Sequence, residues 1–215
     1  MDLSSPLRSI APTLDSTVLE VLAGTEGTMG VTQIARLGGR GTRQGLSLAL
    51  DRLVEAGLVI AQPGNRGHLY RFNRDHVLAD AVLSATRARL TILGRITSKA
   101  EHLSPRPLHV SVFGSFARRK AGPDSDIDVL VVLPDRCELD DHVYAQLREL
   151  GDDVFAWTGN RMEYLLFNVG GFGDAVVKGE DIVHSWVRDC ITLLGYPIEH
   201  LVQAAHGERA QMGRS

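Results

Sequence analysis

Residues 109–134, HVSVFGSFARRKAGPDSDIDVLVVLP, constrain the fold more than any other part of this sequence. The alternating, β-branched residues 109–113 predict a strand that ends at Gly114-Ser115. The following residues, 116–120, favour a helix. A strand, a small-residue turn and the start of a helix present backbone N–H groups and a hydroxyl to an anion. The segment therefore predicts a phosphate-binding turn, in which glycine permits close approach of the phosphate.

A pair of carboxylates precedes the apolar run 129–133, which predicts a second strand. Asp126 and Asp128 are two residues apart, so in a strand they point to the same face. Without a cation their charges repel each other and one pKa rises. Mg²⁺ prefers such oxygen ligands and leaves room for triphosphate oxygens. We therefore predict a Mg²⁺ site, with two ions as in in-line displacement enzymes and Mn²⁺ as an alternative.

The spacing of Gly114-Ser115, ten residues, and Asp126-x-Asp128 resembles the signature of nucleotidyltransferases of the DNA polymerase beta type. Ala117-Arg118 and Ser125 also resemble the pattern of the minimal nucleotidyltransferases of prokaryotes. The resemblance covers roughly residues 105 to 170. It implies an NTP-dependent enzyme, most often using ATP, that moves a nucleoside monophosphate to an acceptor and releases pyrophosphate.

The resemblance also implies roles for individual residues. Asp126 and Asp128 would bind the metal ions. The nucleotide-binding residues would be Gly114, Ser115, Arg118, Arg119, Lys120 and Ser125. Ser115 would contact the β- or γ-phosphate, and one of the three basic residues would stabilise the departing pyrophosphate.

A third carboxylate on a neighbouring strand is general in this family. Residues 161–167 predict that strand, after a helix over 139–157, and Glu163 is the candidate for metal binding and for help to the nucleophile. The family more often has Asp at this place. The alternative is that Glu163 is a solvated strand residue.

The first 75 residues predict three helices and a hairpin. Apolar residues recur at helical spacing over 14–22, 31–37 and 43–56, where Thr42 is the expected N-cap. Two short strands follow, with the turn 63–67 between them. This order resembles the winged helix-turn-helix of bacterial regulators. The resemblance implies DNA contacts from Arg40, Thr42, Arg43, Gln44, Ser47, Arg66 and His68. The alternative is a module for protein contacts or dimerisation.

The whole chain is expected to be an α+β protein in four parts. These are a winged helix-turn-helix domain at 1–75, a linker helix at 76–104, a nucleotidyltransferase domain at 105–203 with a small mixed sheet flanked by helices, and a frayed tail at 204–215. A homodimer is one of the oligomeric states that this organisation allows, since many winged-helix proteins bind paired half-sites.

The composition limits the cellular location and the kind of DNA contact that we expect. The net charge of −3 is spread along the chain, so DNA binding would need a local basic patch. The two cysteines have no CxxC spacing and fit a reducing compartment. The sequence has neither the apolar core of a signal peptide nor a membrane span. These features predict a cytoplasmic protein that makes no membrane contact.

Two hypotheses follow. In the first, the chain is a nucleotidyltransferase and a DNA-binding, antitoxin-like regulator that modifies a partner toxin protein; small molecules or an RNA end remain open as acceptors. In the second, it is a DNA-binding regulator whose nucleotidyltransferase domain only senses nucleotide or binds a protein.

Overall fold

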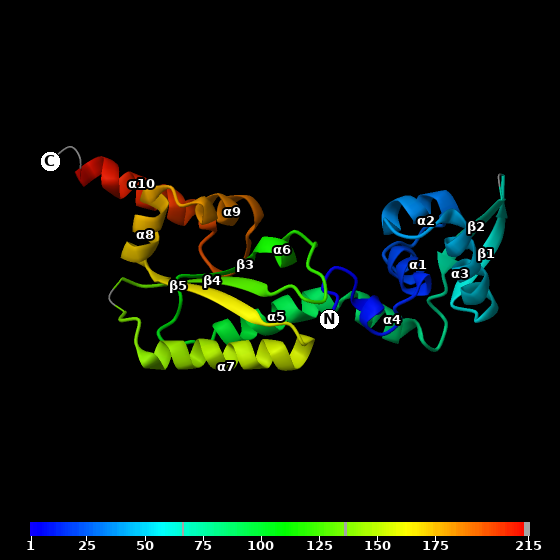
Figure 1. Ribbon diagram of the computed structural model, residues 1–215, viewed down its shortest axis with the longest axis horizontal. Coiled ribbons are helices and arrows are strands. Elements are labelled where there is room, and N and C mark those ends of the chain that lie inside the picture. The colour runs from blue at the N-terminus through cyan, green and yellow to red at the C-terminus, as the bar shows by residue number, and fades with distance from the viewer. Residues whose placement is uncertain (66, 136, 213–215) are drawn as a thin grey trace. The chain divides into compact units, whose positions relative to one another are not determined.

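The computed structural model describes residues 1–65, 67–135 and 137–212. Within them the chain divides into two compact units. The N-terminal unit comprises Asp2 and Ser4–Arg89, and the C-terminal unit comprises Met1, Leu3 and the chain from Leu90 onward. The helices and strands of both units are drawn in Figure 1.

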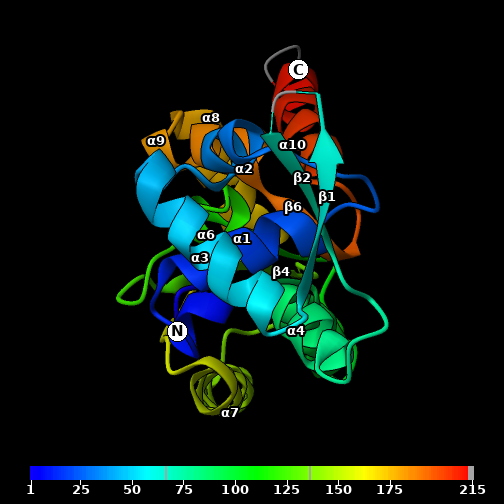
Figure 2. The same ribbon diagram turned by 90° about the vertical axis from the view of Figure 1, so that its right-hand side faces the viewer.

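The N-terminal unit consists of helices around a small core and one antiparallel hairpin. Its elements are η1 (Pro6–Ser9), α1 (Leu14–Ala23), α2 (Val31–Gly38), α3 (Arg43–Glu55), β1 (Val59–Gly64), β2 (Gly67–Phe72) and α4 (Ala79–Thr86). The Thr42 side chain accepts a hydrogen bond from the Gly45 N–H and so caps α3, as predicted. Met29, between α1 and α2, forms an isolated antiparallel bridge with Tyr70 of β2. Figure 2 shows the three helices beside the hairpin.

The core of this unit follows from the helical spacing of its apolar residues. Fully buried side chains from α1, α2 and α3 pack together with residues of β1 and β2. They include Val18, Leu22, Ile34, Leu46, Leu50, Val59 and Phe72. The predicted helix stripes are therefore the core-facing sides of the three helices.

The predicted linker helix over 76–104 is wrong in one respect. The segment forms two helices, α4 and α5 (Ala88–Ala100), with a break at Arg87. No glycine or proline marks this break. The reason is tertiary: Ala79 and Val82 of α4 pack in the core of the N-terminal unit, whereas Ile92 and Ile96 of α5 pack in that of the C-terminal unit.

The C-terminal unit is built on a four-stranded mixed sheet of order β5-β4-β3-β6. Its strands are β3 (His109–Phe113), β4 (Ile127–Leu133), β5 (Met162–Asn168) and β6 (Ile191–Gly195). Its helices besides α5 are α6 (Gly114–Ala117), α7 (Asp141–Thr158), α8 (Val169–Lys178), α9 (Asp181–Asp189) and α10 (Ile198–Met212). β3 is antiparallel to β4 and β6, and β5 is parallel to β4. This agrees with the predicted small mixed sheet between helices.

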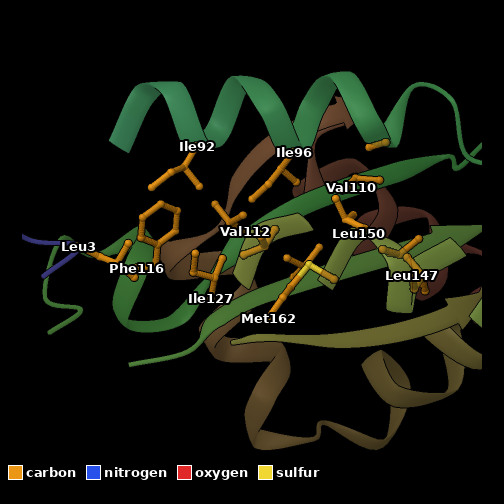
Figure 3. Packing of buried hydrophobic residues seen from close by; sticks show 14 of the residues in the cluster. Leu3, Ile92, Ile96, Val110, Val112, Phe116, Ile127, Leu147, Leu150 and Met162 are labelled. Atoms are coloured by element: carbon orange, nitrogen blue, oxygen red, sulfur yellow. The ribbon is translucent and has the colours of Figure 1, made fainter. Parts of the chain in front are cut away.

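The sheet separates two apolar clusters. On one face, residues of α5 and α7 pack on alternate strand residues, among them Val110, Val112 and Ile127, as Figure 3 shows. On the other face, α8, α9 and α10 cover Phe113, Leu130 and Val132. Trp186 of α9 is fully buried there and packs against three phenylalanines, with ring centroids 5.6 to 6.4 Å apart. Both faces are covered, so nearly every residue of β4 is buried.

Asp128 is the exception in β4, since it is only partly buried. It shares its sheet face with Leu130 and Val132, on the side of α8 and α9, because residues two apart in a strand point the same way.

The C-terminal part differs from prediction at two places. The apolar residues after Cys190 form the edge strand β6, which was not predicted, because they pair with β3. The predicted tail at 204–215 is wrong where the structure describes it, since α10 continues to Met212. The start of α10 is held to the domain by Ile198, which is buried in the cluster beneath α8 and α9.

Across the residues that the structure describes, no helix is both long and apolar enough to span a bilayer. Cys137 and Cys190 are both free thiols and half-buried.

Candidate active site

The turn between β3 and α6 lies directly against Asp128. Gly114 begins α6 with a φ of +67°, a conformation that L side chains rarely adopt. A Cβ atom built on Gly114 would lie 2.0 Å from Oδ2 of Asp128. Only glycine therefore lets the phosphate-type turn and this carboxylate approach each other. Ser115 follows in α6 and is half-buried.

The carboxylates come from two neighbouring strands. Asp126 is exposed just before β4, and Asp128 is half-buried within it. Because β4 and β5 are parallel, Asp128 pairs in register with Glu163, and Phe113 is its partner on β3. Residues paired in register share a sheet face, so Glu163 lies beside Asp128 on the predicted strand.

The electrostatics of this group favour a cation. Burial raises the pKa of Asp128, the charge of Asp126 raises it further, and Glu163 adds to this. Arg118 acts in the opposite direction. A hard divalent ion would relieve the repulsion among three carboxylates, so the donor set fits the predicted metal. In the described parts of the chain, however, no three acidic, His or Cys side chains converge into a ready-made metal cage.

Of the three basic residues after Ser115, one is distinguished by its contacts. Arg118 ends α6, its charge acts on Asp128, and its Nη1 donates to Oδ2 of Asp189 at 2.6 Å. Arg119 is exposed with a φ of +58°, and Lys120 is also exposed. Arg118, rather than its neighbours, is therefore the basic residue whose charge acts on Asp128.

Ser125 has a local partner. Its Oγ accepts a hydrogen bond from the Gly122 N–H at 2.9 Å, which closes the turn before Asp126. In this structure the hydroxyl that was predicted to bind nucleotide holds the backbone of its own turn.

Asn160 is a residue that sequence reasoning missed. It is 3% exposed, and its Nδ2 donates to the carbonyls of Pro123 and Ser125, each at 2.9 Å. Its Oδ1 accepts from the amino group of Met1 at 2.9 Å. These bonds fix the turn that leads into Asp126. The only sequence signal was a polar residue at the entry to a strand.

Asp189, at the end of α9, is the second residue that was missed. Its carboxylate binds Arg118 from 71 positions further along the chain, a separation that no local pattern reveals.

The residues predicted to bind DNA lie at two places in the N-terminal unit. Arg43 and Ser47 of α3 and His68 of β2 line one cavity of about 320 Å³. Arg40, Thr42 and Gln44 are exposed next to the start of α3. Arg66 lies outside the described residues.

Comparison with known families bears on the C-terminal unit. Residues 93–163 match the nucleotidyltransferase domain family. The match runs from α5 to Glu163 and includes both the Gly114 turn and the Asp126–Asp128 pair. It confirms the predicted enzyme class, a nucleotidyltransferase, and it does not extend to the N-terminal unit.

Solved structures that are similar to this chain include two of toxin-antitoxins. A crystal structure of a toxin-antitoxin with AMP-PNP is 16% identical, with a TM-score of 0.39. A mutant of the toxin-antitoxin MntA-HpeT is 15% identical, with a TM-score of 0.38. Each comparison covers 56% of this chain and 88% of the other. No curated protein matches the sequence.

Proposed function

We propose that the C-terminal unit transfers a nucleoside monophosphate from an NTP, with ATP as the first candidate, to an acceptor. The observation that carries this proposal is the contact between Asp128 and the Gly114 turn, with Asp126 and Glu163 beside them. A glycine turn of the kind that binds phosphate lies against a strand carboxylate, and two further carboxylates lie on the same and the neighbouring strand segment. That combination fits a triphosphate with its metal ions better than either feature alone.

In the proposed reaction an acceptor oxygen forms a bond to the α-phosphorus. The bond from that phosphorus to the oxygen bridging toward the β-phosphorus breaks, and pyrophosphate leaves with the oxygen. The acceptor proton moves to a base, for which Glu163 is the candidate because it is exposed to an incoming group. Gly114 and Ser115 bind phosphate oxygens through backbone N–H groups and the hydroxyl.

Asp126 and Asp128, with Glu163 as a third ligand, are the residues that would hold Mg²⁺ or Mn²⁺. When bound, one or two such ions would supply charge neutralisation for the triphosphate and the leaving pyrophosphate. Arg118 adds a fixed positive charge at the same place.

We also propose that the N-terminal unit is a winged helix-turn-helix that binds DNA. Its three helices are followed by a hairpin, and the Met29–Tyr70 bridge adds the short strand between α1 and α2 that this fold contains. Arg43 and Ser47 would then face the major groove from α3, and His68 would lie on the wing. Arg40, Thr42 and Gln44 are exposed and would add contacts at the helix start.

A DNA-binding unit and a transferase unit in one chain favour an acceptor that takes part in gene regulation. An antitoxin that represses its own promoter and modifies a partner toxin would need both activities in one chain. This role is an analogy at the level of the fold. We include a cytoplasmic location and a DNA-bound homodimer in the proposal, and we take the product of the adjacent gene as the first acceptor to test.

The test is transfer of label from ATP labelled at the α-phosphate, with Mg²⁺ and that partner. Wild-type protein is expected to label the partner, and Asp126→Asn/Asp128→Asn to lose at least about a hundredfold in rate. Asp124→Asn, an exposed acid in the preceding turn, is the matched control and should transfer normally. Wild-type protein that binds its promoter yet labels no acceptor would instead favour the regulator with a non-catalytic domain.

A further inference from the structure

Asp189 is placed to control the arginine nearest to the carboxylate group. Its side chain is only 6% exposed, although it lies at the end of the surface helix α9. Oδ2 accepts from Nη1 of Arg118 at 2.6 Å. Arg118 itself is 37% exposed at the end of α6. The contact therefore ties an otherwise solvated arginine to a nearly buried anchor.

A second arginine shares the same carboxylate. Arg188 donates from Nε to Oδ1 of Asp189 at 2.9 Å and from Nη2 to Oδ2 at 2.8 Å. The Ser185 hydroxyl lies 3.4 Å from Oδ2. The hydrogen bonds from Arg188 and Arg118 hold the pKa of Asp189 well below its usual range. Two guanidinium groups and one carboxylate leave one net positive charge, so Asp189 orients Arg118 without cancelling the local positive charge.

Arg118 lies one helical turn from the Gly114 turn, because its backbone N–H donates to the Gly114 carbonyl at 3.2 Å. Gly114 in turn lies directly against the Asp128 carboxylate. An arginine free in solvent loses rotamer freedom when it binds an anion. A carboxylate that fixes it beforehand removes part of that cost. Arginine is also suited to two partners at once, since its planar fork offers five donors.

We propose that Asp189 is a positioning residue that holds Arg118 toward the β- and γ-phosphates of the NTP and the pyrophosphate that leaves. The inference rests on the proposed function, since it assumes that a triphosphate binds at the Gly114 turn. It assigns a role in that site to α9, which the family match at residues 93–163 does not include.

The first measurement is calorimetric binding of two ligands with Mg²⁺: a non-transferable ATP analogue with a methylene group between the α- and β-phosphates, and AMP. Asp189→Asn is expected to weaken binding of the analogue by about tenfold, the value of one hydrogen bond between charged groups. Its binding of AMP should stay unchanged, because AMP lacks the phosphates that Arg118 reaches. A purely structural role would weaken both ligands alike.

A double-mutant cycle supplies the second readout. If Asp189 acts through Arg118, then Asp189→Asn has no further effect on analogue binding in the Arg118→Ala protein. Asp174→Asn, an exposed acid on α8, is the control and should bind both ligands like wild-type.

The outcomes distinguish a failure of the proposed function from a failure of the positioning role of Asp189 alone. Wild-type protein that binds no analogue overturns the proposed function together with this inference. Wild-type protein that binds the analogue, with Asp189→Asn equal to it, overturns the positioning role alone. Additive losses in the cycle also overturn it, since they show that Asp189 does not act through Arg118.

Discussion

At the scale of single residues, the candidate site contains a carboxylate whose charge lowers the stability of the metal-free fold. Asp128 is half-buried, lies against Gly114, and faces the charges of Asp126 and Glu163. Its raised pKa means that the ionised carboxylate is less stable in the folded chain than in the unfolded one. Asn160 donates a hydrogen bond to the turn before Asp126. The positive charge of Arg118 partly offsets the rise in the pKa of Asp128.

We therefore expect Asp128→Asn to stabilise the metal-free protein while it abolishes transfer. A pKa that is raised in the folded state contributes stability at low pH, and that contribution is lost as the pH rises through it. At pH 7 the variant should melt above wild-type, by a few degrees at most in a chain of this length. The gap should close as the pH falls below the ordinary Asp value.

Thermal melts from pH 3 to 8 without divalent ions check this expectation. Asp124→Asn is the matched control, since its carboxyl lies in an exposed turn, and it should leave the melting temperature unchanged. An Asp128→Asn protein that melts below wild-type at pH 7 would contradict the argument. Added Mg²⁺ should raise the melting temperature of wild-type protein more than that of the variant.

At the scale of helices and strands, the predictable parts are those with a local cause. The strands β3, β4 and β5 were predictable from short apolar and β-branched runs bounded by turn residues, and the helix α7 from the helical spacing of its buried residues. The Gly114 turn was predictable from residue type. So was Glu163, because a strand after a helix crossover returns parallel to its neighbour.

The elements that were missed depend on distant partners. The edge strand β6 forms only because β3 has a free edge, although the run before Gly195 has strand-like residues. The break at Arg87 appears because two cores divide one apolar stripe between them. Asp189 could not be found for a similar reason, since its role depends on a residue brought near it by the sheet.

The helix α3 carries the prediction on DNA. Arg43→Ala, at the exposed start of α3, should weaken binding to the protein's own promoter region by about tenfold if it contacts a base. Gel shifts at low salt with promoter and unrelated DNA measure this. Arg52→Ala, on the last turn of the same helix and paired with Asp15, is the matched control. Absence of any DNA affinity in the wild-type chain would rule out the winged-helix proposal.

At the scale of the whole molecule, the first few residues of the chain contribute side chains to two separate hydrophobic cores. Leu3 is 1% exposed within the core of the C-terminal unit, whereas Leu7 is 6% exposed within that of the N-terminal unit. Asp2, between Met1 and Leu3, binds Arg8 and so groups with the N-terminal unit. Neighbouring side chains thus contribute to different units.

These two leucines form a matched pair for a test. Leu3→Ala and Leu7→Ala are each expected to cost about 2–5 kcal/mol, the usual effect of removing a buried leucine. Hydrogen exchange resolved by segment should show lost protection in β3 and β4 for Leu3→Ala, and in α1 and α3 for Leu7→Ala. Loss confined to α1 and α3 in both variants would show that Leu3 does not belong to the sheet core.

The position of Leu3 has a consequence for synthesis on the ribosome. Residues of the same core that lie near it, such as Phe116 and Ile127, are translated long after it. The N-terminal unit can close its own core as soon as its hairpin and α4 have emerged, since domains fold as units during translation. Leu3 must wait for α6 and β4. Translation therefore completes the DNA-binding candidate first and delays the enzyme until most of the chain exists.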